Sequence, residues 1–248
     1  MSDPENEKRE IAEKLHPTYS EKILNGMMAE RAVKRITFDR SEANPGEKLY
    51  VSVPKLNGNE VLVPGSLELR FDIDLSKGNA NNFLVQNVTR ALVDQLVVKF
   101  ASTTLQDTVG YDIYKTFEDL FVSQETREGM ILEGIRSMQD PLRLGRQENL
   151  ASRAENKLED VFGKKYRIRL DHQILTDHSV FYPEALYNDL TFYISLAPAV
   201  QVVKGPEKTE LKYKLTNIQL EYEMIRSNTL AEEAESVYLM GKEFAMTT

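Results

Sequence analysis

The stretch SLELRFDIDL, residues 66–75, decides the fold class. Every second residue in it is apolar, and these side chains share one face of an extended chain: Leu67, Leu69, Phe71, Ile73 and Leu75. The residues between them are charged and point the other way: Glu68, Arg70, Asp72 and Asp74. This period of two residues is typical of a half-buried strand in an antiparallel sheet. We therefore expect the apolar set to line a core and the charged set to face solvent or an interface.

Similar segments recur along the chain, so that we expect seven to eight strands. The clearest of them are KLYVSVP (48–54), ALVDQLVVKF (91–100), TTLQDTV (103–109), KYRIRLD (165–171), LTFYISLA (190–197) and LKYKLTNIQLEYEMI (211–225). Four of their residues should join the same core: Phe192, Ile194, Leu220 and Tyr222. The strands do not alternate with helices, which argues against a parallel sheet and for two packed antiparallel sheets.

The spacing of the strands favours a jelly roll over an immunoglobulin-type sandwich. Immunoglobulin-type chains turn every 8–12 residues, whereas about fifty residues separate the strands that end near Val109 and begin near Tyr166. We predict an all-β chain with helical insertions: a jelly-roll β-sandwich of two antiparallel sheets with short N- and C-terminal helices. The jelly-roll domain should span 36–226, with a helical insertion near 112–162. One apolar stripe of that insertion has helical spacing: Ile113, Phe117, Leu120 and Phe121.

The two ends of the chain have a helical period. Residues 1–35 are expected to form an N-terminal helical arm, and 227–248 a C-terminal helix and tail. Thr229 and Glu232 have the spacing of a capping box at the start of the C-terminal helix. Each end is a single amphipathic element, which must bury its apolar residues against this domain or another copy. The candidate oligomer-interface residues are therefore Ile23, Met27, Met28, Leu230, Val237 and Tyr238.

The pattern of apolar residues in the last long segment, 211–225, indicates an irregular strand. Its apolar residues have odd numbers up to Leu215 and even numbers from Ile218 onward. A regular strand cannot bury both sets on one face, so we expect a bulge near Thr216 and Asn217.

Two Asp-His pairs, Asp171-His172 and Asp177-His178, are the strongest candidates for chemistry. On a strand the histidines would lie roughly 20 Å apart, too far to share a metal ion that each ligand must approach to about 2 Å. They could share one only if the chain turned at ILTD (174–177), and no third ligand is evident nearby. Neighbouring residues of a strand also point to opposite faces, which prevents the carboxylate from orienting its own histidine. Structural histidines are the favoured interpretation, and a metal hydrolase at these four residues is the open alternative.

The amino-acid composition excludes several classes of binding site and partner. The chain has no cysteine, which excludes disulfides and thiolate metal sites and fits synthesis in a reducing compartment, the cytosol or nucleus. The formal net charge of -8 argues against broad electrostatic adhesion to nucleic acid and leaves local basic patches as the alternative. We expect no sequence-specific binding of nucleic acid. No apolar run approaches the ~20 residues of a membrane span, and no phosphate-binding loop motif occurs. We expect no enzyme activity and no cofactor.

Four long segments carry a resemblance to a known family: VPKLNGNEVLVPGSLELRFDIDL (53–75), NNFLVQNVTRALVDQLVVKFASTTLQDTVGYDIYKTFEDLF (81–121), KKYRIRLDHQILTDHSVFYPEALYNDLTFYISLAP (164–198) and KLTNIQLEYEMI (214–225). They resemble the N-terminal jelly-roll part of the major capsid proteins of Polinton (Maverick) elements, which belong to the double jelly-roll lineage. The resemblance extends from Lys55 to Phe244.

This resemblance implies a structural capsid protein, or a capsid-derived self-assembling protein, located in the virion. It implies homo-oligomers, as trimers or other capsomers, and contacts with other capsid proteins. A double jelly roll needs two sandwiches in tandem, and 248 residues supply one. The chain could be an excised first half, a truncated copy or a free-standing jelly roll. The alternative function is that of a host-retained β-sandwich that binds a protein or glycan partner without assembling.

Overall fold

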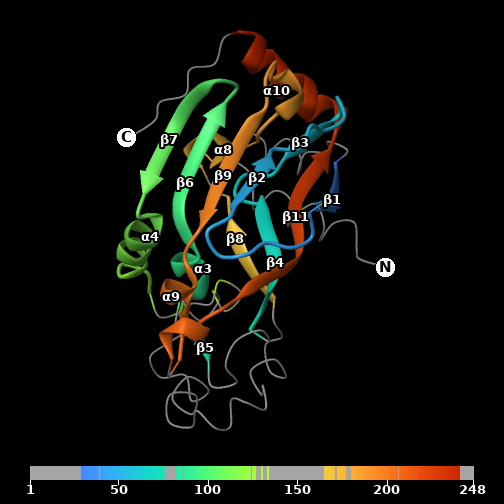
Figure 1. Ribbon diagram of the computed structural model, residues 1–248. Coiled ribbons are helices and arrows are strands. Elements are labelled where there is room, and N and C mark those ends of the chain that lie inside the picture. Colours follow the sequence, from blue (N-terminus) through green and yellow to red (C-terminus); the bar gives the residue numbers. More distant parts are fainter. Residues whose placement is uncertain are drawn as a thin grey trace.

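Two antiparallel sheets pack face to face in the computed structural model of the chain (Figure 1). The structure describes residues 29–38, 40–75, 82–85, 87–123, 125–126, 130, 133, 165–170, 172–176, 180–205 and 207–240. The strands of each sheet come from distant parts of the chain, as expected for a sandwich in which long connections cross between the sheets.

The first sheet is built around its longest strand, β11 (Lys214–Arg226). Its strand order is β1 (Glu30–Thr37), β11, β4 (Glu68–Asp74) and β8 (Lys165–Arg169), and β3 (Glu60–Leu62) also pairs with β11. All of these pairings are antiparallel.

The second sheet has the strand order β2 (Lys48–Ser52), β9 (Leu190–Leu196), β6 (Val93–Phe100) and β7 (Thr103–Val109). Its pairings are also antiparallel. A further two-stranded sheet joins β5 (Phe83–Leu84) to β10 (Val203–Lys204). The predicted arrangement of two antiparallel sheets is confirmed.

The core between the sheets contains the residues that the alternation predicted. Eight of them are no more than 3% exposed: Leu67, Leu69, Phe71, Ile73, Phe192, Ile194, Leu220 and Tyr222. Leu75 is partly buried and packs against the same cluster. Each alternating strand therefore contributes its apolar face to a core shared by both sheets, which is the main source of stability in a sandwich.

The predicted bulge in β11 is also confirmed. The register between β4 and β11 shifts between Thr216 and Gln219, and Asn217 has a positive φ of 52°. The extra residue changes the parity of the strand. As a result Leu215 and Ile218, which could not share a face in a regular strand, are both buried.

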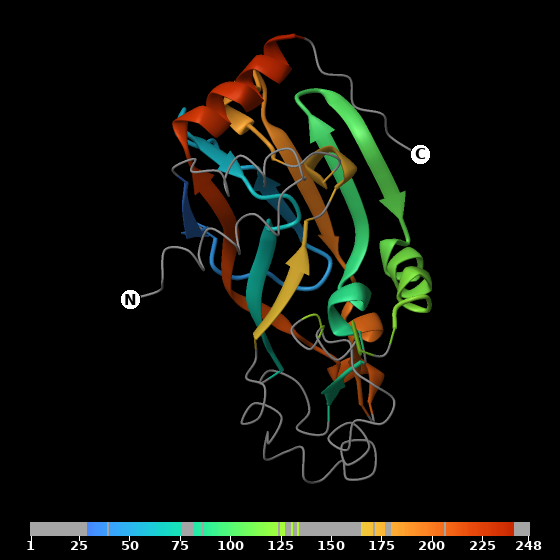
Figure 2. The same ribbon diagram turned by 180° about the vertical axis from the view of Figure 1, so that it is seen from behind.

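Short helices connect and cover the strands. They are α3 (Val88–Ala91), α4 (Tyr111–Asp119), α8 (Gln173–Thr176), α9 (Ala199–Val202) and α10 (Asn228–Leu239), with the 3-10 turns η3 (Pro183–Ala185) and η4 (Lys208–Glu210). Helix α10 lies across one end of the sandwich beside β3 (Figure 2). In the described ranges, no helix is both long and apolar enough to cross a membrane.

The start of α10 differs from the predicted capping box. The N-cap is Ser227, whose extended backbone lets its side chain accept a hydrogen bond from the Leu230 N–H at 3.4 Å. Thr229 already lies inside the helix and is exposed. The prediction failed because both residues are good N-caps, and their order is decided by where β11 ends.

The predicted N-terminal helical arm is wrong over residues 30–35, which form most of β1. Alternation explains the strand: Ala32 packs toward the core, while Arg31 and Arg35 on the other face form ion pairs with Glu223 and Glu221 of β11. These partners lie far away in the sequence, so the segment alone looks like a charged helix. Residues 1–28, with Ile23, Met27 and Met28, lie outside the described part of the chain.

Candidate functional site

The predicted interface residues of α10 are used largely within the domain. Leu230 is fully buried in a second, smaller core with Val61 and Ile225. The Tyr238 ring packs edge-on against Phe181, with centroids 6.3 Å apart. Its hydroxyl oxygen accepts a 3.4 Å hydrogen bond from a backbone N–H, that of Tyr182. Val237 remains on the surface, 37% exposed.

The one described member of the two Asp-His pairs, His172, has a structural position. It is buried, and its Nδ1 accepts a hydrogen bond of 3.2 Å from the backbone N–H of Ile174 in the first turn of α8. Asp171, Asp177 and His178 lie outside the described residues. Among the residues that the structure does describe, no group of three or more His, Asp and Glu side chains could hold a metal ion.

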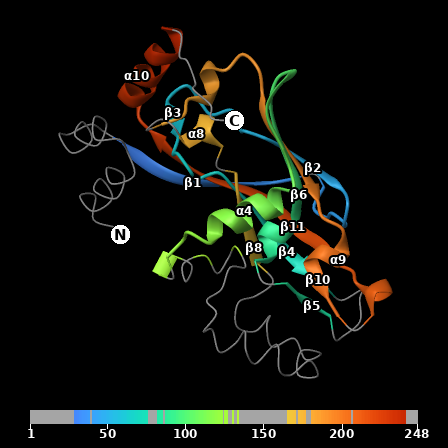
Figure 3. The same cartoon turned by 90° about the vertical axis from the view of Figure 1, so that its left-hand side faces the viewer.

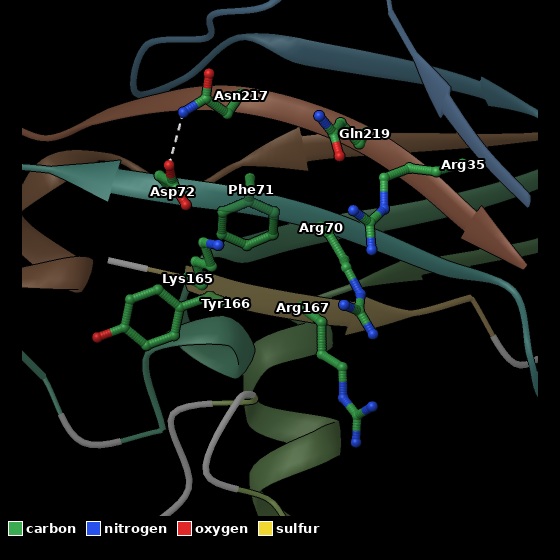
Figure 4. A pocket seen from close by; sticks show the side chains of 9 residues that line it. All are labelled: Arg35, Arg70, Phe71, Asp72, Lys165, Tyr166, Arg167, Asn217 and Gln219. Carbon is green, nitrogen blue, oxygen red and sulfur yellow. Dashed lines mark hydrogen bonds between the residues drawn. The ribbon is translucent and has the colours of Figure 1, made fainter. Parts of the chain in front are cut away.

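A polar pocket of about 270 Å³ lies on the outer face of the first sheet, on the side opposite the core (Figure 4). Strands β1, β4, β8 and β11 supply its walls: Arg35, Arg70, Phe71, Asp72, Lys165, Tyr166, Arg167, Asn217 and Gln219. The Asn217 side chain, which the bulge of β11 places here, donates a 2.7 Å hydrogen bond to Asp72. The pocket therefore depends on the bulge as well as on the charged faces of the strands.

Figure 4 shows Arg35, Arg70 and Arg167 side by side across three strands. Glu221 accepts hydrogen bonds from Arg35 at 2.7 Å and binds Arg70 at 2.7 Å. Glu68 then accepts from Arg70 at 2.5 Å and from Arg167 at 3.1 Å. We call these five residues the arginine–glutamate row.

The arginine–glutamate row compensates for like charges that lie opposite each other on neighbouring strands. Glu68 lies directly opposite Glu221, and Arg70 lies directly opposite Arg167. Like charges in opposite positions destabilise a strand pair, but here each charge bonds diagonally to one of the other sign. The row also corrects one expectation: Glu68, which the alternation placed on the solvent side, is only 8% exposed.

A second buried carboxylate, Glu60, joins β1, β3 and β11. It receives hydrogen bonds from Arg226 at 2.9 Å, from Lys34 at 3.2 Å and from the backbone N–H of Asn57 at 3.2 Å. Burial alone would raise the pKa of Glu60, but these donors outweigh it, and the pKa is lowered below its usual value. Glu60 is therefore an ionised structural group and has no proton to give near neutral pH.

A third charged cluster attaches α3 and α4 to β8. Glu133, fully buried, binds Arg90 of α3 at 3.1 Å and Arg169 of β8 at 3.2 Å. Arg90 also binds Asp119 of α4 at 3.2 Å. Burial would lower the pKa of Arg90, but the two carboxylates raise it, so its positive charge is secured. The side of α4 that faces the domain is thus held by the Arg90–Asp119 ion pair.

The charged clusters have a structural role in common. Their carboxylates and guanidiniums are bonded to one another across strands, an arrangement that fixes strand register. Sequence reasoning missed the pocket because its residues come from four separate strands. The available signal was the charged alternate positions of those strands, such as Arg167 and Arg169 beside Glu68 and Arg70.

The fold defined by these sheets is a jelly-roll sandwich, and comparison with solved structures bears this out. One similar structure is that of VP54 of the virus PBCV-1, fitted into a cryo-EM reconstruction of the virophage Sputnik, with a TM-score of 0.51 and 12% identity. Another is a quasi-atomic model of the PBCV-1 capsid, with a TM-score of 0.50 and 12% identity. Each match covers 84% of this chain and 45% of the other chain.

The chain thus spans less than half the length of these structures. No protein-family model matches it, and no curated protein matches its sequence. At this identity the likeness establishes the fold.

Proposed function

We propose that the chain is a structural, shell-forming capsid protein, or a self-assembling protein derived from one. The observation that carries the proposal is the overlap of 84% of the chain with proteins of a virus capsid. The clusters around Glu60, Glu133 and the arginine–glutamate row fit such a role, because they join strands and do not arrange reactive groups. We further propose that it is not an enzyme.

The finer assignment rests on the four segments that resemble Polinton (Maverick) capsid proteins. On this basis we propose the N-terminal jelly-roll part of a double jelly-roll capsid protein, located in the virion and made in a reducing compartment. Its partners would be copies of itself, in trimers or other capsomers, and other capsid proteins. The N-terminal residues Ile23, Met27 and Met28, and the exposed Val237, stay candidates for these contacts.

Size-exclusion chromatography with multi-angle light scattering, followed by electron microscopy of any large species, tests the proposal. We expect oligomers whose mass rises with protein concentration. Deletion of 1–28, which keeps β1 whole, and Val237→Ser should each reduce that mass if these candidates are interface residues. A chain that stays monomeric at the highest soluble concentration would instead favour a sandwich that binds a protein or glycan without assembling.

A further inference from the structure

Helix α4 is attached to the domain by its polar side. Gly110, with a φ of 70°, turns the chain out of β7 and into the helix. The helix then buries Tyr111 and Asp119 against the domain, and Asp119 pairs with Arg90. Lys115 lies between them on the same side, with its ammonium 5.7 Å from the centre of the Tyr111 ring.

The opposite side of α4 is apolar and exposed. Helix α4 itself lies at the outside of the molecule, beyond the end of β7 (Figures 1 and 3). We call five exposed side chains the α4 apolar face: Ile113 (73% exposed), Tyr114 (50%) and Phe117 (59%) of the helix, with Leu120 (65%) and Phe121 (77%) of the turn that directly follows Asp119. Phe117 and Phe121 stack edge to face, 5.3 Å apart. A surface helix of a globular protein normally turns its apolar side to the core, so this orientation is inverted.

The α4 apolar face is large enough to be an interface. Its three aromatic rings and two aliphatic side chains expose roughly 500–700 Å², judged from the ~150–250 Å² that one aromatic side chain buries. The largest apolar patch of an ordinary monomer is about 300–600 Å². Two such faces packed together would bury about 1,200 Å², which reaches the lower limit of a specific protein–protein interface.

The positions of the five residues favour one occupant, a second copy of α4. Counted along the sequence, they are symmetric about Phe117: Tyr114 and Leu120 lie three residues on either side, and Ile113 and Phe121 lie four. When two copies pack antiparallel about a twofold axis at Phe117, each of these residues meets an apolar residue of the other copy. A contact of this kind is self-complementary.

Charge supports the same occupant. The chain carries a formal net charge of -8, so two copies repel each other over most of their surface. The α4 apolar face has no charged member, and the neighbouring Lys115 and Glu118 already pair with each other at 2.7 Å. Two like-charged copies can therefore meet here without burying an unpaired charge.

We propose that the α4 apolar face forms a twofold, antiparallel contact with the α4 apolar face of a second copy of this chain. The contact rests on the proposed self-assembly and names one surface that carries it. It differs from the contacts expected at the chain ends. Because a twofold contact does not occur within a trimer, it would link copies that belong to neighbouring capsomers.

The first experiment breaks the contact with charge. The double variant Phe117→Glu/Phe121→Glu places carboxylates where the two faces would meet, and Tyr187→Glu, at a side chain 95% exposed outside this face, is the matched control. Sedimentation velocity over a concentration series should show association weakened by at least ~30-fold in the double variant, as for loss of an interface hot spot. The control should associate like the wild type, and circular dichroism should show that all three are folded.

The second experiment fixes the geometry, and the absence of native cysteine makes every introduced thiol unique. Under mild oxidation Phe117→Cys should form a disulfide-linked dimer, since the twofold axis brings position 117 of both copies together. Ile113→Cys alone should not, because its symmetry mate lies ~12 Å away along the helix. A mixture of Ile113→Cys and Phe121→Cys should form the mixed dimer, and Tyr187→Cys should form none.

Each negative result has its own meaning. If the wild type assembles but the double variant assembles equally well, the α4 contact is wrong and the proposed capsid function stands. If the double variant loses monomer stability without any change in association, the face is covered by the same chain, and the contact is again wrong. Loss of association without the predicted disulfides would overturn the antiparallel geometry. A wild type that never associates would overturn both proposals.

Discussion

Replacement of Phe71 by Ala tests the core of the sandwich directly. Phe71 is 2% exposed on β4, beside Tyr166 of β8 and opposite the bulge of β11. A buried aromatic side chain removes ~150–250 Å² from water, worth about 4–6 kcal/mol at 25 cal/mol per Å². Alanine keeps one carbon of that side chain, which leaves a loss of about 3–5 kcal/mol, in line with Phe→Ala changes in other cores.

The matched control is Phe117→Ala, the same chemical change on the exposed side of α4. In the monomer it should alter the free energy of unfolding by no more than about 0.5 kcal/mol. Both variants should be compared with the wild type by urea unfolding followed by far-UV circular dichroism, since the chain has no tryptophan to report. The protein must be dilute enough to be monomeric, because association stabilises the native state.

Thermal unfolding measures the stability loss of Phe71→Ala independently. For a chain of this size 1 kcal/mol corresponds to a shift of about 2–4 °C, so Phe71→Ala should lower Tm by about 6–20 °C. A loss of less than 1 kcal/mol for Phe71→Ala, or equal losses for the two variants, would refute the placement of Phe71 in the core.

Three further predictions follow from single contacts. Glu60→Gln should cost about 1–3 kcal/mol at pH 7, because buried donors lose a charged acceptor. The lowered pKa of Glu60 means that this stabilisation is present above the unfolded value of ~4.3 and is lost as the pH falls through the folded pKa. The gap between wild type and variant should therefore narrow as the pH falls below that unfolded value, and a gap that does not change with pH would contradict the ion-pair explanation. Asn217→Val should be about 1–2 kcal/mol less stable than Asn217→Gly in urea unfolding, since a β-branched residue resists a positive φ; equal stabilities would argue against the bulge. Ser227→Ala should cost about 0.5–2 kcal/mol and Thr229→Ala close to nothing, and the reverse order would restore the predicted capping box.

The strands and the core could be predicted because their signal is local. Alternation in residues 66–75 and the parity change in β11 depend only on which face of an extended chain each side chain occupies. Phe71 and Ile218 could therefore be assigned to the core without knowledge of their neighbours. The general fold class followed from the number and spacing of such segments.

The features that sequence reasoning missed are all tertiary. The segment of strand β1 resembles a charged helix in the sequence because the ion-pair partners of Arg31 and Arg35 lie 192 and 186 residues further along the chain. Glu68 is buried only because Arg70 and Arg167 neutralise it. The helical stripe of α4 was recognised, but its direction depends on where the domain presents Arg90 to Asp119.

The position of β11 has a consequence for the order of events during synthesis. Strands β1 and β4 do not pair with each other. Both pair with β11 (Lys214–Arg226), which is translated after them. At ~5–20 residues per second, a ribosome takes about 10–40 s to travel from β1 to β11. During that interval β1 and β4 have none of their β11 hydrogen bonds, and the first sheet cannot close. The first sheet of a nascent chain therefore stays open, and its sandwich unfinished, until β11 has been translated.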